Sequence, residues 1–160
     1  MKLLVKIRLL ILFFITATII SGITAFPLQT ELHWVLQFKN KLPIALGDWL
    51  QSCYTAMVNT NIKYPMLAYG YDWLAFAHII IASAFIGPLI NPVKNIWVIE
   101  WAMIACIAVW PLALIAGPIR GIPTFHIIID CCFGVFGLIP LIICRHWIKK
   151  LDNQNLIIKK

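Results

Sequence analysis

Five ionisable residues stand inside or beside long apolar stretches of this chain. They are Asp72, His78, Arg120, His126 and Asp130. A charged side chain at the centre of a bilayer costs about 3 kcal/mol even on the most lenient scales, so each such group needs a partner, a water-filled cavity or a function. An imidazole beside a carboxylate can relay a proton or act as a base, and an arginine can anchor an anion.

The depths of these residues indicate a common site. A helix rises about 1.5 Å per residue, so His78 lies about 9 Å inward from Asp72, and Asp130 lies about 9 Å inward from Thr124. Two different helices therefore bring an imidazole and a carboxylate to the same level. The other three ionisable residues lie nearer the surface, so we expect a polar site near the outer face of a helical bundle.

Helical phase supports an inward orientation for the last apolar stretch. A single face of its helix carries His126, Asp130, Gly134, Gly137 and Leu141. Small residues let neighbouring membrane helices approach closely, so this face is predicted to point inward. Ala75 and Ala82 flank His78 in a similar way. Asp72 stands about 120° away from His78 around its helix, so we expect it to meet Arg120 or water at the rim.

Four apolar stretches position these residues, at 9–26, 72–90, 97–116 and 125–144. About 20 apolar residues suffice for a helix to cross a bilayer core of roughly 30 Å. The sequence therefore predicts an all-α membrane protein with four transmembrane helices in a bundle. Residues 1–160 form a single integral membrane domain, with an outer loop at 27–71 and a cytoplasmic tail at 145–160.

Composition agrees with this class. Hydrophobic residues make up 62% of the chain and charged residues 12%, about half the charged fraction of a soluble domain. The net charge of +7 comes from basic residues concentrated near both chain ends, which is typical of the cytoplasmic flanks of membrane helices. The expected partner is the lipid bilayer, and a nucleic-acid partner is not expected.

The same basic residues predict the topology. They place both termini in the cytoplasm and the connections at 27–71 and 117–124 outside. The predicted location is the plasma (inner) membrane, most consistent with a bacterial cell. The first apolar stretch also resembles a signal peptide, but 18 residues exceed the usual hydrophobic region and 23–25 form a poor cleavage site. Its removal would leave the orientation of the other three spans unchanged.

The outer loop is too apolar for a disordered linker. Leu46, Trp49, Leu50, Cys53 and Met57 recur at helical spacing, and a shorter helix is expected around Leu32–Leu36. These one or two amphipathic helices either lie in the membrane interface or cover the mouth of the bundle as a lid.

A purely structural role for the polar residues also stays open. Asp130 could be neutralised by His78, His126 or Arg120 in a buried contact that only specifies helix register. Glu100 is interpreted as a structural pair with Lys94 or Arg145. The cysteines lack the spacing of a redox pair, and no metal-ligand spacing is present.

The leading interpretation is a small multi-pass membrane protein that is a non-enzymatic binding or accessory subunit. Its partners would be further copies in a homo-oligomer or the subunits of a larger membrane complex. The alternative is a membrane enzyme acting on a lipid or lipid-linked substrate, with His126 or His78 as base and Asp130 orienting it. A second alternative is a haem-binding electron-transfer protein that uses His78 and His126 as axial ligands. No residue pattern identifies a cofactor beyond that haem alternative.

Overall fold

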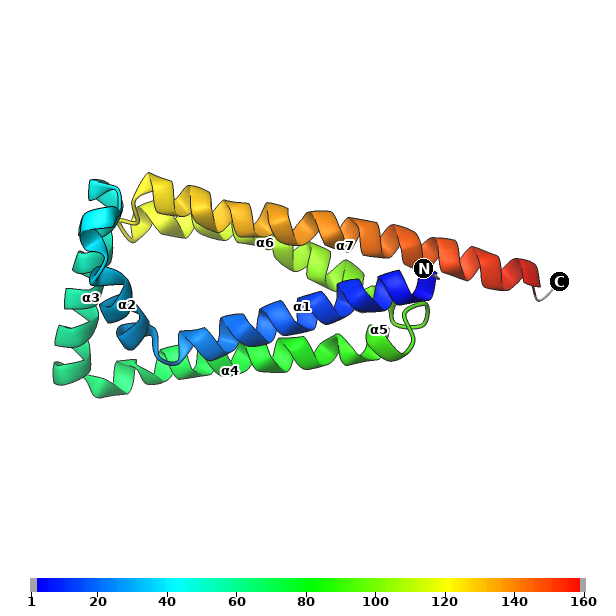
Figure 1. Ribbon diagram of the computed structural model, residues 1–160, viewed down its shortest axis with the longest axis horizontal. Helices are drawn as coiled ribbons and strands as arrows, with labels where there is room; N and C mark the ends of the chain where they lie inside the picture. Colours follow the sequence, from blue (N-terminus) through cyan, green and yellow to red (C-terminus); the bar gives the residue numbers. More distant parts are fainter. Residues whose placement is uncertain (1–2, 159–160) are drawn as a thin grey trace. The chain divides into compact units, whose positions relative to one another are not determined.

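The computed structural model describes residues 3–158, and these residues contain helices and no strand. The elements in chain order are α1 (Leu3–Ala25), α2 (Leu28–Leu36), η1 (Lys39–Lys41), α3 (Ile44–Lys63), η2 (Pro65–Leu67), α4 (Tyr69–Ala84), α5 (Ile86–Ile90), α6 (Ile96–Ile119) and α7 (Thr124–Ile158). Figure 1 shows their path along the chain.

Four helical segments are long and apolar enough to cross a membrane. They are Leu3–Ala25, Pro65–Ile90, Ile96–Ile119 and Thr124–Gln154. Because a bilayer core needs about 20 apolar helical residues, these segments indicate a membrane protein and confirm the four predicted apolar spans.

The chain divides into two compact units. Unit 1 contains the residues before Thr16 and those from Ala84 onward, and unit 2 contains Thr16–Ser83. Both α1 and the second span therefore contribute to each unit. The two units are described separately below.

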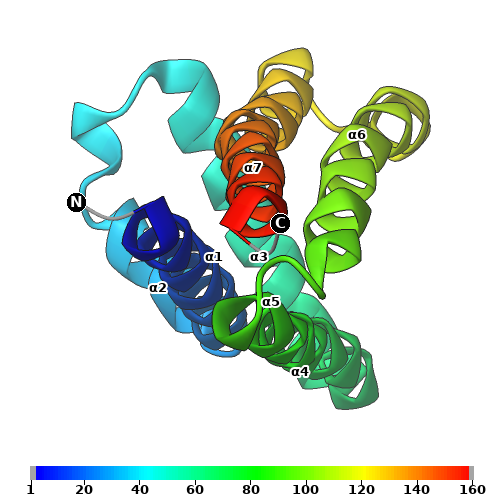
Figure 2. The ribbon, with the colours of Figure 1, turned by 90° about the vertical axis from the view of Figure 1, so that its right-hand side faces the viewer.

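In unit 1, α6 and α7 run side by side (Figures 1 and 2). Its buried core combines residues from the start of α1, from α6 and from α7, with Phe85 at the break in the second span. The core consists of Ile7, Ile11, Phe85, Val98, Ile99, Ala102, Leu141, Cys144 and Ile148. The ring of Phe14 stacks on that of Phe85 with 5.9 Å between ring centroids.

Two glycines bring α7 close to α6. A Cβ atom added at Gly134 would lie 2.7 Å from the carbonyl oxygen of Cys106, and one added at Gly137 would lie 2.8 Å from the Cys106 sulfur. Leu141, one turn further along, is 1% exposed. This part of the predicted inward face of the fourth span is therefore confirmed.

The second span is interrupted, whereas the sequence led us to expect one continuous stretch over 72–90. Helix α4 ends at Ala84 and α5 begins at Ile86. Pro88 explains the interruption. Its ring clashes with the carbonyl group of Ala84, four residues earlier, and proline has no N–H to donate to that carbonyl. The last carbonyl groups of α5 lie at a helix end, where donors from outside the helix complete their hydrogen bonding.

Arg8 and Asn95 supply those donors. Arg8 donates from Nε to the carbonyl of Leu89 at 3.1 Å and from Nη2 to that of Ile90 at 3.3 Å. Asn95 donates from Nδ2 to the Gly87 carbonyl at 3.0 Å. The sequence placed Arg8 among the basic flanking residues, and its role at the end of α5 was not foreseen.

Helix α7 continues well past the predicted end of the fourth span at 144. It has 35 residues, about 52 Å of helix, which exceeds a bilayer core. After Pro140 it contains no proline or glycine, so nothing stops the helix when the apolar run ends. Ile148 is fully buried, and Trp147 and Leu151 pack beside it. The predicted tail is therefore helical as far as Ile158.

In unit 2, the second half of α1 packs against α4 at a glycine. A Cβ atom added at Gly22 would lie 2.8 Å from the carbonyl oxygen of Ala75 and 3.0 Å from the Cβ of His78. The predicted small-residue stripe is confirmed here, since Ala75 is fully buried and Ala82 is 1% exposed.

Helices α2 and α3 form the connection between the first two spans. Asn61 of α3 donates from Nδ2 to the Gln29 Oε1 of α2 at 2.7 Å. The rings of His33 and Tyr54 lie 5.8 Å apart between centroids. Helices are therefore present at both positions, and α3 extends to Lys63.

Candidate functional site

A tight hairpin connects α6 to α7 and presents Arg120. The backbone N–H of Arg120 donates to the Ala116 carbonyl at 3.0 Å, and that of Ile122 donates to the Gly117 carbonyl at 3.0 Å. Gly121 has a φ of +68°, a left-handed conformation that glycine adopts without strain. The Arg120 side chain is exposed, and within residues 3–158 no ion pair involves it.

His126 and Asp130 lie together on the first turns of α7. They are four residues apart, and the His126 Nε2 lies 3.8 Å from the Asp130 Oδ1. This separation allows electrostatic attraction but exceeds a hydrogen bond. Each side chain is 39% exposed. The pair therefore keeps an accessible side from which a further polar group can approach.

Trp110 holds α7 in register beneath this pair. Its indole Nε1 donates to the Cys131 carbonyl at 3.1 Å, and it lies against Gly134. A side chain of α6 thus bonds to the backbone of α7 one residue beyond Asp130. Sequence reasoning did not single out Trp110. The glycine at 134 was the available signal, because an indole needs such a space to reach a helix backbone.

His78 belongs to unit 2 and has its own local partners. Its Nδ1 lies 2.8 Å from the Leu74 carbonyl, so the Nδ1–H donates and Nε2 remains an acceptor in the neutral ring. Its Cβ faces Gly22 of α1. The convergence of His78 with Asp130 stays a prediction.

Asp72 also belongs to unit 2, on the first turn of α4. It lines a pocket of about 330 Å³ together with the aromatic side chains of Phe26, Tyr69, Trp73 and Phe76. The ring centroids of Tyr69 and Trp73 lie 5.9 Å apart in an edge-to-face arrangement. Its predicted contact with Arg120 or water stays a prediction.

Glu100 forms the structural pair that its position predicted. The Arg145 Nε donates to the Glu100 Oε1 at 2.7 Å, joining α6 to α7 at the opposite end from His126. Of the two basic residues considered, Arg145 is therefore the partner. The short charge-assisted bond neutralises Glu100.

The cysteines are free thiols: Cys53, Cys106, Cys131, Cys132 and Cys144. Burial raises the pKa of the Cys53 thiol, which keeps it protonated at neutral pH. Within residues 3–158, no three histidine, cysteine or acidic side chains lie together in a way that could hold a metal ion.

No family model matches this chain, and no curated protein or solved structure matches it either.

Proposed function

We propose that this protein is a non-enzymatic binding or accessory protein of a cell membrane, with a polar site near the outer face of its helices. Arg120, His126 and Asp130 are the residues of this site in unit 1. Asp72 and His78 are separate candidate polar residues of unit 2. The ligand is a small polar molecule, a lipid headgroup or a polar side chain of a partner subunit.

The observation that carries this proposal is the loose His126–Asp130 pair. Its atoms are 3.8 Å apart, and each side chain is 39% exposed within a segment long and apolar enough to span a membrane. Lipid chains cannot solvate a carboxylate, so a partly exposed aspartate within such a segment favours a ligand, a proton or a partner. Glu100 has no such need for a ligand, because Arg145 binds its carboxylate at 2.7 Å.

Replacing Asp130 by asparagine separates a binding site from a structural contact. Asparagine preserves side-chain volume but removes the negative charge that lies 3.8 Å from His126. We expect Asp130→Asn to abolish function while membrane abundance and thermal unfolding stay near wild type. The measurement is complementation of a deletion phenotype, with abundance followed by immunoblot.

Glu100→Gln is the matched control, because it makes the same change in a structural pair. It should reduce abundance and function together. If Asp130→Asn also reduces them in parallel, Asp130 is only a structural contact. A normally abundant, fully active Asp130→Asn protein would equally overturn the proposed site.

The proposed orientation is tested by labelling. In unit 1 the basic residues Arg8 and Lys94 line one pocket with the α7 residue Asp152, so they share one end. Positively charged ends of membrane helices remain in the cytoplasm. Single cysteines in a cysteine-free protein should react with an impermeant maleimide in intact cells at Asn59 and Gly121, but not near either terminus. Labelling of the C-terminal region from outside would reverse the topology.

A further inference from the structure

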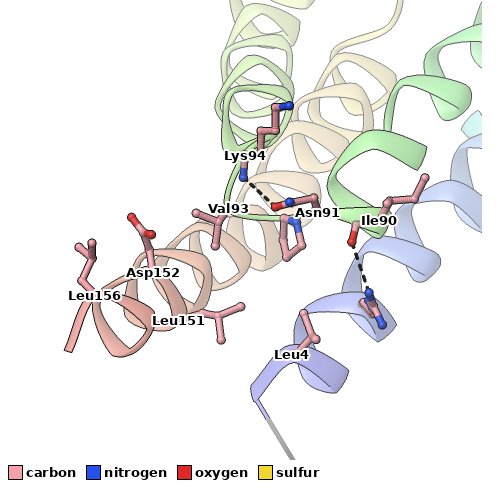
Figure 3. Close-up of a pocket in the computed structure, with 10 residues that line it drawn as sticks. Leu4, Ile90, Asn91, Val93, Lys94, Leu151, Asp152 and Leu156 are labelled. Atoms are coloured by element: carbon pink, nitrogen blue, oxygen red, sulfur yellow. Dashed lines mark hydrogen bonds between the residues drawn. The ribbon is translucent and has the colours of Figure 1, made fainter. Parts of the chain in front are cut away.

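A pocket of about 460 Å³ opens at the basic end of unit 1, far along α7 from the His126–Asp130 pair. Its walls come from the start of α1, the connection between α5 and α6, and the last turns of α7. Figure 3 shows Leu4, Lys94 and Asp152 on these three elements. The volume falls within the usual range for small-molecule sites, roughly 300–1,000 Å³.

Arg8 provides an oriented cation in this pocket. Its two hydrogen bonds to the carbonyls of Leu89 and Ile90 position the guanidinium at the end of α5. Carbonyl groups are neutral, so the positive charge remains. A guanidinium has five N–H donors, and two of them are used here. The remaining donors and the charge suit a phosphate group, and Lys94 adds a second positive charge to the lining.

Asp152 places a negative charge in the same pocket. It belongs to α7, and no ion pair within 4.0 Å joins it to Arg8 or Lys94 in the described part of the chain. The pocket therefore carries separated charges of both signs. A simple anion would meet repulsion from Asp152, whereas a ligand with a phosphate and a cationic group would match both.

Apart from Asn91, the remaining lining is apolar, and it lies near the ends of candidate membrane spans. Leu4, Leu151 and Leu156 line the pocket. Leu4 is the second residue of the first candidate span, Ile90 ends the second, and Leu151 is near the end of the fourth. The pocket therefore sits where span ends meet lipid headgroups, with apolar side chains that can contact a glycerol backbone and acyl chains.

We propose that this pocket binds the headgroup of a phospholipid with a primary amine, of the phosphatidylethanolamine type. Arg8 binds the phosphate, with Lys94 adding attraction, and the Asp152 carboxylate accepts hydrogen bonds from the ammonium. A choline headgroup has no N–H to donate, and a phosphatidylglycerol headgroup has no cation to pair with Asp152. This site is independent of the one proposed above.

Native mass spectrometry of the full-length protein in detergent tests this proposal. The protein is titrated separately with phosphatidylethanolamine, phosphatidylcholine and phosphatidylglycerol that carry identical acyl chains. A hydrogen bond to a charged group contributes enough for roughly tenfold in affinity. We therefore expect the ethanolamine lipid to bind roughly tenfold more tightly than the other two.

Single substitutions test which charged side chain binds which part of the headgroup. Asp152→Asn should remove the preference for ethanolamine over choline and improve binding of phosphatidylglycerol. Lys94→Gln should weaken all three lipids to a similar extent, because each carries a phosphate. Arg8→Gln should weaken binding of the three lipids more than Lys94→Gln does. If the loss of the hydrogen bonds to α5 prevents Arg8→Gln from folding, Lys94→Gln alone tests the role of positive charge. Asp48→Asn, which neutralises an aspartate in unit 2, is the matched control and should leave the affinities for the three lipids unchanged.

Two results would overturn the proposal. One is equal binding of the three lipids by the wild type, and the other is an unchanged preference in Asp152→Asn. A competition arm distinguishes a lipid from a soluble ligand: phosphoethanolamine or inorganic phosphate should displace the lipid poorly, because neither contacts the apolar lining. Displacement by phosphoethanolamine at concentrations matching the lipid would show a site for the soluble headgroup instead.

Discussion

Gly134→Ala is expected to destabilise the packing of α6 on α7. The added methyl group would lie 2.7 Å from the Cys106 carbonyl oxygen and 2.8 Å from the Trp110 Nε1. A backbone carbonyl in a helix cannot move aside as a flexible side chain can, so the two helices must separate. Overpacking of this kind costs about 1–3 kcal/mol, and the Trp110–Cys131 hydrogen bond is strained as well.

Gly70→Ala is the matched control, since it makes the same change on helix α4 where an added Cβ meets nothing within 4 Å. Alanine favours a helix over glycine by about 1 kcal/mol, so this variant should be neutral or slightly stabilised. Thermal unfolding of the purified proteins in detergent measures the change in stability of Gly134→Ala and of Gly70→Ala. Equal unfolding temperatures for the two variants would contradict the close approach of α6 and α7.

Glu100→Gln is expected to produce a second large loss of stability. The variant leaves the Arg145 guanidinium without the carboxylate that now lies 2.7 Å away. Removing one member of a fully buried ion pair costs about 3–5 kcal/mol. These two side chains are 41% and 37% exposed, so solvent screening lowers the expected cost to roughly 1–3 kcal/mol. Exchanging the two residues, Glu100→Arg with Arg145→Glu, should restore part of the lost stability.

The Lys39–Asp48 pair in unit 2 provides the comparison. Its atoms are 2.9 Å apart, but it lies in the connection between spans and the Asp48 side chain is 65% exposed. Exposed pairs contribute about 0–1 kcal/mol, so Asp48→Asn should change the unfolding temperature little. Similar losses for Glu100→Gln and Asp48→Asn would show that Glu100 is as well solvated as a surface residue.

Local sequence information was sufficient to predict the four spans and several of the buried helix faces. Uninterrupted apolar runs of about 20 residues predict membrane helices because the cost of exposing a peptide group to lipid depends on each segment alone. The small-residue spacing similarly predicted the Gly134–Leu141 face and the buried Ala75 and Ala82. The Glu100–Arg145 pair was foreseen because a carboxylate near a span end needs a cation within reach.

Other features depended on neighbours that are distant in the chain. The end of the fourth span was placed at 144 because hydropathy falls there. Helix α7 nevertheless continues to Ile158, and Ile148 is buried in the unit 1 core. Pro88 is a recognisable helix breaker. The donors that bind the last carbonyl groups of α5 nevertheless come from Arg8, about 80 residues away, and from Asn95.

The sequence alone was enough to predict the membrane environment and the approximate positions of the spans, because hydrophobicity is a property of contiguous residues. It also located the costly charges. The packing of α6 on α7 selected the partner of Glu100, which Arg145 binds at 2.7 Å. Whether Glu100 is paired depends on atoms of another helix at a separation of a few ångströms, and apolar periodicity does not specify positions that finely.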